Sequence, residues 1–226
     1  MGQQESTCWT LVRGAAAGNL ADRDEFARRY APVIQAYVAA RWRLPVQDER
    51  VTEAVQEVFL QCFKEGGALE KVDDSRAGGF RAYLYGVTRN VTRTFENRRA
   101  RRRGRSPDGT PSPEELEARE ATLSSVFDRA WARMVTREAR DLMLVWAGRD
   151  ANARRRLDIL KARYEEDIPP RDIASRLELP PLKVYQVLTQ ARKEFRAALL
   201  QIMSDYHPSD TREELEQRCR DLLASL

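Results

Sequence analysis

The chain has 226 residues, 33% of them charged, and a formal net charge of +4, so its length suits two modest domains and its net charge indicates little about a partner. Its three cysteines are widely spaced and form no CxxC pair, which argues against a disulfide framework or a zinc site. Apolar runs stay shorter than the roughly 18 residues of a membrane span and no signal-peptide pattern is visible, so we expect a cytoplasmic protein without membrane insertion.

Helical periodicity runs through nearly the whole chain and no alternating strand pattern appears, which predicts an all-α fold. The first helices are expected over residues 7–17, 21–42, 47–64 and 79–103, with an irregular loop over 66–78. The stretch GRSPDGTPSP at 104–113 then interrupts the pattern, because its three prolines and two glycines cannot continue a helix. Later helices are expected over residues 113–135, 137–149, 153–165, 170–177, 181–204 and 211–226.

The interruption divides the sequence into two predicted helical domains. Ser112, Pro113 and Glu115 supply a cap, a first-turn proline and a capping-box glutamate, so a new helix is expected to begin there. We therefore expect a first domain, a Pro/Gly linker, a second domain and a C-terminal extension helix, over residues 1–103, 104–113, 114–204 and 205–226.

The helix predicted over 79–103 has two distinct faces. Phe80, Leu84, Val87, Val91 and Phe95 recur at spacings of three and four and form a stripe suited to a core. An adjoining face mixes amides that hydrogen-bond base edges with guanidiniums that bind phosphates. Its members are Asn90, Arg93, Thr94, Asn97, Arg98 and Arg101. An ordinary solvated face is the alternative, but asparagines placed between arginines favour a nucleic-acid surface.

Residues 170–196 have the pattern of a helix-turn-helix. The inner positions of the first helix are Ile173, Ala174 and Leu177, a turn follows at 178–179, and prolines begin the second helix. Val184, Leu188, Ala191 and Phe195 are expected to face inward. The outward side chains suit a DNA major groove, and they are Lys183, Tyr185, Gln186, Thr189, Gln190, Arg192 and Lys193. The alternative is an ordinary helical hairpin, because Glu178 stands where a glycine would ease the turn.

Four segments in order carry a resemblance to a known family. They are LVRGAAAGNLADRDEFARRYAPVI, VTEAVQEVFLQCFK, FRAYLYGVTRNVTRTFENRRARRR and ARYEEDIPPRDIASRLELPPLKVYQVLTQARKEFR, beginning at residues 11, 51, 80 and 162. The chain thereby resembles the extracytoplasmic-function sigma factors, the small two-domain members of the sigma-seventy class. The first domain is similar to sigma region 2 and the second to sigma region 4.

The resemblance implies two partners, core RNA polymerase and promoter DNA. The first domain would bind the β′ coiled coil of the polymerase through Arg50, Thr52, Glu53, Gln56 and Glu57. It would also help to melt the minus-ten element, with the loop at 68–74 holding an extruded base and the polar face of the 79–103 helix following the separated strand. The helix-turn-helix would read the minus-35 element as duplex.

The sequence departs from the family where the polymerase is bound. Typical members have Asp-Ala-Glu-Asp where residues 50–53 here are Arg-Val-Thr-Glu, so only Glu53 keeps its charge. Those acids normally face basic residues of the coiled coil, and we therefore expect weak polymerase binding by the unmodified protein. A phosphate on Thr52 would restore about −1.5 to −2 charges. This resembles a branch of the family in which a Ser/Thr kinase replaces the usual anti-sigma factor. The alternative is that Thr52 is simply exposed and Asp48 and Glu49 supply the charge.

Two other functions compete with a sigma factor. A helix-turn-helix repressor or a sigma-like decoy would act without core polymerase, but neither needs a polymerase-binding helix around Gln56 and Glu57. An enzyme is not expected, because we find no glycine-rich phosphate loop, metal cluster or nucleophile with a histidine partner. No cofactor or metal site is expected, and the single histidine, His207, has no cysteine near it in the sequence.

Overall fold

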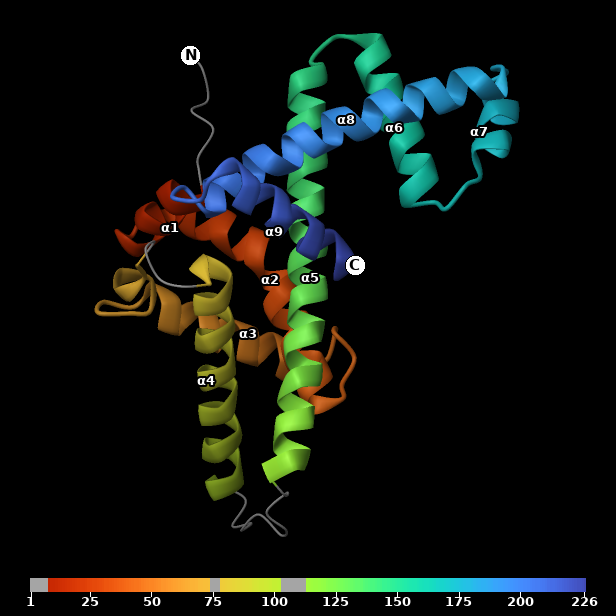
Figure 1. Ribbon diagram of the computed structural model, residues 1–226. Coiled ribbons are helices and arrows are strands. Elements are labelled where there is room, and N and C mark those ends of the chain that lie inside the picture. The colour runs from red at the N-terminus through yellow and green to blue at the C-terminus, as the bar shows by residue number, and fades with distance from the viewer. Residues whose placement is uncertain (1–7, 74–77, 103–112) are drawn as a thin grey trace.

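The computed structural model of the chain describes residues 8–73, 78–102 and 113–226, which form helices and the segments that connect them (Figure 1). The predicted all-α fold is confirmed for these residues. The helices are α1 (Cys8–Ala16), α2 (Leu20–Trp42), α3 (Glu49–Phe63), the short 3-10 helix η1 (Leu69–Lys71), α4 (Gly79–Arg102), α5 (Pro113–Ala147), α6 (Ala151–Tyr164), α7 (Pro170–Arg176), α8 (Pro181–Tyr206) and α9 (Arg212–Ala224). None of these helices is both long enough and apolar enough to cross a lipid bilayer.

Polar side chains mark the starts of several helices. The Asn19 side chain accepts hydrogen bonds from the first backbone N–H groups of α2, and Asp48 and Asp150 do the same for α3 and α6. Thr211 and Glu214 form a reciprocal capping box at the start of α9. Such caps satisfy N–H groups that have no partner within the helix, typically stabilising it by about 1 kcal/mol each.

One sequence prediction about the helices is wrong. Residues 113–135 and 137–149 were expected to form two helices, but α5 is continuous for 35 residues. The interruption expected near Thr136 does not occur, because buried residues continue at helical spacing on both sides of it and hold one face of the helix in the core, at Ala132, Val135, Ala139 and Leu142. The helix ends instead at Ala147, and the next residue, Gly148, has a φ of +50° that glycine readily adopts.

The continuous α5 joins two groups of helices, which we name the N-terminal bundle (α1–α4) and the C-terminal unit (α5–α9). Helix α5 packs along α2, and α8 crosses α5 and reaches α1 (Figure 1). Buried residues of α1–α5, α8 and α9 belong to one hydrophobic cluster. The division into two domains stays a prediction. The helices before and after the predicted linker nevertheless share one hydrophobic core. Apart from Pro113, that linker lies outside the described residues.

Aromatic rings form the centre of this shared core. Tyr30 of α2 stacks on Trp131 of α5 with ring centroids 5.8 Å apart, and Tyr206 of α8 meets Trp131 edge-on at 5.2 Å. Nearer the beginning of α5 in the same interface, Tyr37 of α2 packs edge-on against Phe127. Rings of this size bury large apolar areas and add favourable ring contacts. The aromatic cluster therefore fixes α5 and α8 against α2.

A smaller core holds the other end of the C-terminal unit. Ile159 of α6, Ile173 and Ala174 of α7, and Val184 and Leu188 of α8 pack together there. We name α6, α7 and residues 181–193 of α8 the arm, because they project from the point where α8 crosses α5 (Figure 1). The second half of α8 is buried in the shared core, so one helix connects the arm to the N-terminal bundle.

Polar groups extend the contact between the bundle and the C-terminal unit. Arg29 Nε lies 3.0 Å from Glu138 Oε1, and the Tyr206 hydroxyl donates to Glu138 Oε2 at 3.2 Å. The Tyr206 hydroxyl also lies 3.3 Å from that of Tyr30, and the Trp9 indole N–H donates to the Tyr206 carbonyl oxygen at 3.4 Å. Helices α1, α2, α5 and α8 are thus joined by one network.

Burial sets the protonation behaviour of this network. Loss of water raises the pKa of Glu138 from 4.5 to about 6, although Arg29 and Tyr206 oppose the shift. Burial disfavours the charge of Arg29, but the Glu138 carboxylate together with Tyr30, Tyr206 and Cys8 outweighs it, so the pKa of Arg29 is raised. Both groups are therefore charged at pH 7, and each depends on the other to offset its loss of hydration.

Replacing Arg29 by Met should leave an unpaired buried carboxylate and lower the free energy of unfolding at pH 7 by about 3–5 kcal/mol. The deficit relative to wild type should shrink as the pH falls from 7 towards about 6 and then stay level, because loss of Arg29 raises the pKa of Glu138 further and the variant takes up its proton at a higher pH than wild type does. Urea unfolding at pH 5 and pH 7 measures both effects.

The matched control is the double substitution Arg29→Met with Glu138→Leu, which should recover most of the lost stability. A deficit that stays constant with pH, or a double variant as unstable as the single one, would contradict the network as described.

Candidate functional site

The polar face of α4 carries the residues predicted to contact a separated DNA strand. At about 100° per helical residue, the six side chains fall within an arc of about 140°. All six are exposed: Asn90, Arg93, Thr94, Asn97, Arg98 and Arg101. The Thr94 hydroxyl donates to the Asn90 carbonyl oxygen at 2.9 Å. The structure thus places these amides and guanidiniums on one exposed surface, and their role with DNA stays a prediction.

The adjoining face of α4 fixes the helix to the bundle. Phe80 and Leu84 are buried, and the remaining members of the predicted stripe are partly buried. Near the end of the helix, the Phe95 ring lies 5.5 Å from the Trp42 ring of α2. The predicted core stripe is therefore confirmed, and it holds the polar face outward.

A glutamate that sequence reasoning did not single out ties α4 to the end of α2. Glu96 accepts two hydrogen bonds from the Arg41 guanidinium, at 2.7 and 2.9 Å, and one from the Trp42 indole at 2.7 Å. Burial would raise the pKa of Glu96, but the hydrogen bonds from Arg41 and Trp42 keep it below its ordinary value. Its charge is offset by Arg41, so it does not cancel the arginines of the exposed face.

The predicted polymerase-binding residues lie on α3, and the first of them is already paired. The Asp48 carboxylate caps the helix and also binds the Arg50 guanidinium with both oxygens, at 2.8 and 2.7 Å. The hydrogen bonds from Arg50 lower the pKa of Asp48 to about 2. Arg50 therefore cancels the charge of the acid that stands next to Thr52 on the surface of the helix.

The rest of the predicted α3 surface faces solvent. Thr52, Glu53 and Gln56 are exposed, and Glu57 is partly exposed. The Thr52 hydroxyl donates to the Asp48 carbonyl oxygen at 3.5 Å. Leu60 lies on the same face with 62% of its surface exposed. Sequence reasoning missed it, although an apolar residue four positions after Gln56 on a polar face was a visible signal.

Ion pairs reduce the negative charge of this surface. Glu57 lies 3.6 Å from Arg98 of the α4 polar face, so one acid predicted to meet the polymerase is paired with an arginine predicted to meet DNA. Glu49 and Glu53 have no ion pair with a described residue. With Asp48 also paired, the surface presents fewer uncompensated acids than its sequence suggests.

The helix-turn-helix pattern is present in the arm. Helix α7 ends at Arg176, and Glu178 adopts a left-handed backbone with φ of +53°. The Leu179 N–H donates to the Ala174 carbonyl oxygen at 2.9 Å and closes the turn before α8. Glu178 thus occupies the position where glycine is preferred, as the sequence indicated.

The inward positions of the two helices agree with the prediction except at one residue. Ile173, Ala174, Val184, Leu188 and Ala191 are buried, and the Phe195 side chain is partly buried. Leu177 was predicted to face inward, but it is 37% exposed. It lies beyond the last residue of α7, in a groove between α6 and α7, where the helical spacing no longer directs it to the core.

The outward face of α8 carries the seven residues predicted to read duplex DNA, and all of them are exposed: Lys183, Tyr185, Gln186, Thr189, Gln190, Arg192 and Lys193. Arg192 is held at the edge of this face, because its Nε donates to the Tyr164 hydroxyl of α6 at 2.7 Å. Leu182, which sequence reasoning missed, lies at the centre of the face and is 70% exposed. An apolar side chain there can contact a thymine methyl group.

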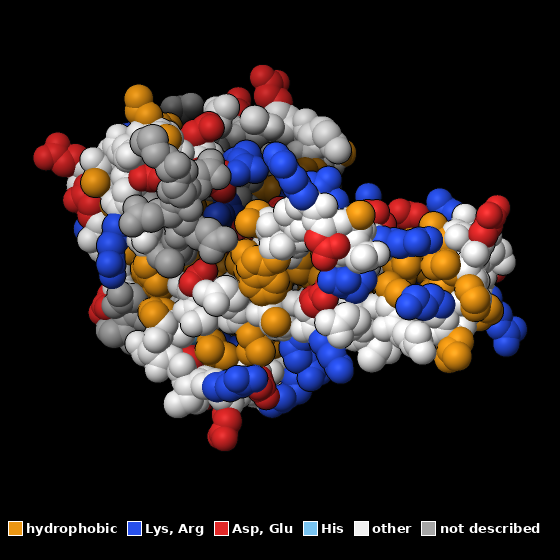
Figure 2. All heavy atoms as spheres, turned by 90° about the horizontal axis from the view of Figure 1, so that it is seen from above, with side chains coloured by type: hydrophobic (Ala, Val, Ile, Leu, Met, Phe, Trp, Pro, Cys, Tyr) orange, Lys and Arg blue, Asp and Glu red, His pale blue; other side chains and the backbone are white. Residues whose placement is uncertain are grey.

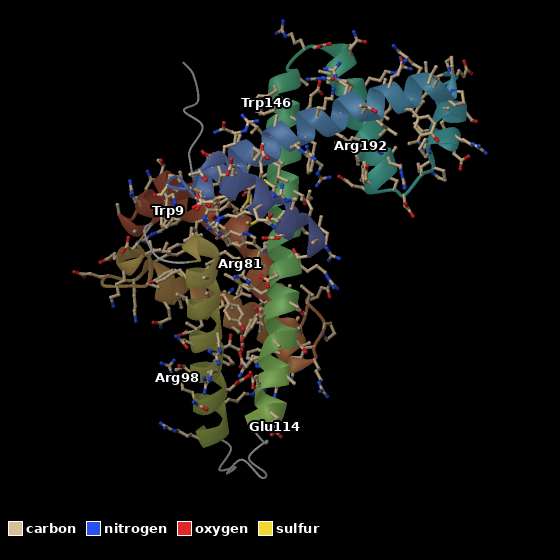
Figure 3. All side chains as sticks on the ribbon, viewed as in Figure 1. Trp9, Arg81, Arg98, Glu114, Trp146 and Arg192 are labelled. Atoms are coloured by element: carbon tan, nitrogen blue, oxygen red, sulfur yellow. The ribbon has the colours of Figure 1, made fainter. Side chains whose placement is uncertain are left out.

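The two candidate DNA faces lie far apart on the molecule. Arg98 marks the lower part of α4 and Arg192 marks the arm, at opposite ends of the long α5 (Figure 3). Seen from the end where α5 meets α6, the narrow arm shows basic side chains beside exposed hydrophobic ones (Figure 2). The described surfaces therefore offer two separate sites of different character.

The loop predicted to hold an extruded base borders an open groove. Residues 68–73 are described, whereas residue 74 lies outside the described residues. Leu69, Glu70, Val72 and Asp73 line this groove of ≈ 610 Å³ together with Trp9 of α1. Its volume is sufficient for a base, and its use stays a prediction.

No protein-family model matches the chain, and no curated protein is significantly similar to it.

Replacing Glu178 by Gly should raise the free energy of unfolding by about 0.5–1 kcal/mol, because glycine adopts a positive φ without the cost that a β-carbon brings. Replacing Lys161, an exposed residue of α6, by Gly should instead lower stability by about 1 kcal/mol. Urea unfolding of both variants tests the turn, and a loss of stability in Glu178→Gly would show that the described turn is incorrect.

Proposed function

We propose that the protein is a sigma factor of the extracytoplasmic-function type, which directs core RNA polymerase to specific promoters and helps to open the minus-ten element. The observation that carries this proposal is the pair of exposed faces on α4 and α8, which differ in chemistry and lie on separate parts of the fold. One face alone would suit many nucleic-acid-binding proteins. Two faces, with a partly acidic helix surface next to one of them, suit a protein that acts on DNA together with a third partner.

The α4 face is suited to a separated strand. Asn90 and Asn97 can donate to and accept from unpaired base edges, while the neighbouring arginines bind the backbone phosphates. The helix itself is held by Glu96 and by the buried stripe, so the face is ordered before DNA arrives. Preformed contacts of this kind reduce the cost of capturing an unstacked base.

The α8 face is suited to duplex DNA. A helix-turn-helix inserts the beginning of its second helix into the major groove. Here that region carries Lys183, Gln186 and Gln190 around the exposed Leu182. Glutamine can bind the edge of adenine with two hydrogen bonds, and lysine can bind guanine or a phosphate. This half of α8 would read the minus-35 element.

We propose that the α3 surface binds the polymerase and that the charge of this surface regulates the binding. Arg50 cancels Asp48, and Arg98 is paired with Glu57, so the unmodified surface attracts a basic coiled coil weakly. A phosphate on Thr52 would add about −1.5 to −2 charges beside these groups. We propose that a Ser/Thr protein kinase supplies this phosphate and thereby activates the protein.

With core polymerase, the Thr52-phosphorylated protein should give a defined run-off transcript from promoters selected from a random DNA library. Core polymerase alone, or the protein alone, should give none. Specific binding of a DNA duplex without polymerase, together with no transcript, would contradict the proposal and favour a helix-turn-helix repressor.

Phosphothreonine placed at residue 52 by semisynthesis should raise the affinity for core polymerase about tenfold, which corresponds to about 1.4 kcal/mol. Pull-down with core polymerase should rank the phosphorylated protein above Thr52→Glu, and Thr52→Glu above wild type and Thr52→Ala. Arg50→Ala should increase binding by the unmodified protein, because it leaves the charge of Asp48 uncancelled.

Thr122→Glu is the matched control, because Thr122 is an exposed helical threonine whose hydroxyl also donates to the carbonyl oxygen four residues earlier. It adds the same charge away from α3 and should not change binding. If the phosphorylated protein and Thr52→Ala bind equal amounts of core polymerase in the pull-down, regulation by phosphorylation of Thr52 is excluded.

A further inference from the structure

The beginning of α8 carries exposed apolar side chains whose ligand the proposed function leaves open. Pro180 and Pro181 are exposed where the turn enters the helix. Leu182 and Tyr185 follow on the surface and are 70% and 50% exposed. Hydrophobic side chains are visible beside basic ones on the arm (Figure 2). Apolar side chains that gather at one place on a surface indicate a contact with a ligand.

Leu182 lies near the middle of the outward face of α8. The buried residues Val184, Leu188 and Ala191 define the opposite side of the helix. At about 100° per residue, Leu182 and Gln186 both point within about 30° of the direction away from those residues. The two side chains are one helical turn apart, about 6 Å along the axis. They therefore form the centre of the surface that the helix-turn-helix presents to a ligand.

The backbone at the beginning of α8 is poorly suited to binding a phosphate. A helix N-terminus binds phosphate mainly through its free backbone N–H groups. Here the cap and the first residue of the helix are Pro180 and Pro181, which have no N–H group. The Lys183 N–H already donates to the Pro180 carbonyl oxygen at 2.9 Å. Glu178, exposed in the preceding turn, adds a negative charge. This end of the helix therefore suits an apolar group better than an anion.

The major groove of DNA presents an apolar group of the required kind, the C5 methyl group of thymine. A helix-turn-helix places the beginning of its second helix in that groove, so Leu182 would reach the edges of the bases. Lys183 and Lys193 are exposed on the same helix and can bind the phosphates beside the groove. Their positive charge complements the DNA backbone and would hold the apolar side chain against the bases.

We propose that Leu182 is a specificity-determining residue that contacts the C5 methyl group of a thymine in the minus-35 element. The inference rests on the proposed function and specifies what that site recognises. Cytosine presents an amino group at the same edge of the major groove. Next to leucine, this donor would lose its water without gaining a hydrogen-bond partner. Leu182 would therefore favour thymine over cytosine at one position of the element.

Deoxyuridine tests this contact, because it lacks the methyl group of thymine and keeps the same base pairing. Each thymine in the minus-35 region of a promoter selected by transcription is replaced singly. The affinity of that promoter for core polymerase with the full-length, Thr52-phosphorylated protein is then measured at one salt concentration. We expect one replacement to weaken binding about fourfold, the effect of leaving one methyl group unburied. In Leu182→Ala the same replacement should change binding less than about 1.5-fold. Leu182→Met should respond as wild type does, because it keeps an apolar side chain of similar volume.

Leu144→Ala is the matched control, because Leu144 is a 48% exposed leucine of α5 outside the arm. It should respond to deoxyuridine as wild type does. If no replacement weakens binding, or if the same replacement weakens wild type and Leu182→Ala equally, Leu182 does not contact a thymine. Either result overturns this inference and leaves the sigma function standing, since the promoter is still bound. If wild type and core polymerase form no promoter complex, the proposed function is overturned and this inference with it.

Discussion

The packing of α5 against α2 is the contact on which the rest of the structure depends. Through Tyr30, Tyr37, Phe127 and Trp131 it brings the two sides of the chain into one core. Helix α5 then carries the arm at its far end, and the second half of α8 returns to the same core. The position of the α8 face relative to the α4 face follows from this interface.

The interface also explains how a chain rich in charge forms a stable core. Charged residues that approach the core are paired across it, as Arg29 is with Glu138 and Arg41 is with Glu96. The arginines of the α4 and α8 faces largely remain at the surface. Charged residues thus serve two purposes in this protein, pairing near the core and forming the exposed faces. The sequence alone does not separate the two groups, because the pairing partners are far away in the chain.

Much of the fold could be predicted from local patterns. The spacing of Phe80, Leu84 and their neighbours identified the buried side of α4, and the polar residues on the adjoining face proved to be exposed. The prolines before α8 and the unusual Glu178 likewise located the helix-turn-helix. In each case the signal lies within a few residues of the feature, where helical geometry alone decides the outcome.

Long-range features could not be predicted in this way. The continuity of α5 through Thr136 and the pairings of Glu138 and Glu96 depend on partners far away in the sequence. The exposure of Leu60 and Leu182 could have been predicted from the sequence, because each interrupts a polar helix face. Helical spacing does not, however, distinguish an apolar residue that contacts a partner from an ordinary surface leucine.

The central claim is that α4 acts on an opened strand and α8 on duplex DNA in a single complex with polymerase. Footprinting of that complex with permanganate and hydroxyl radicals tests this most directly. The account predicts permanganate-reactive thymines in a short stretch near the transcription start and backbone protection about 25 base pairs upstream, about 85 Å along B-form DNA, both only when core polymerase is present. Protection of one duplex site by the protein alone, with no reactive thymines when polymerase is added, would contradict it.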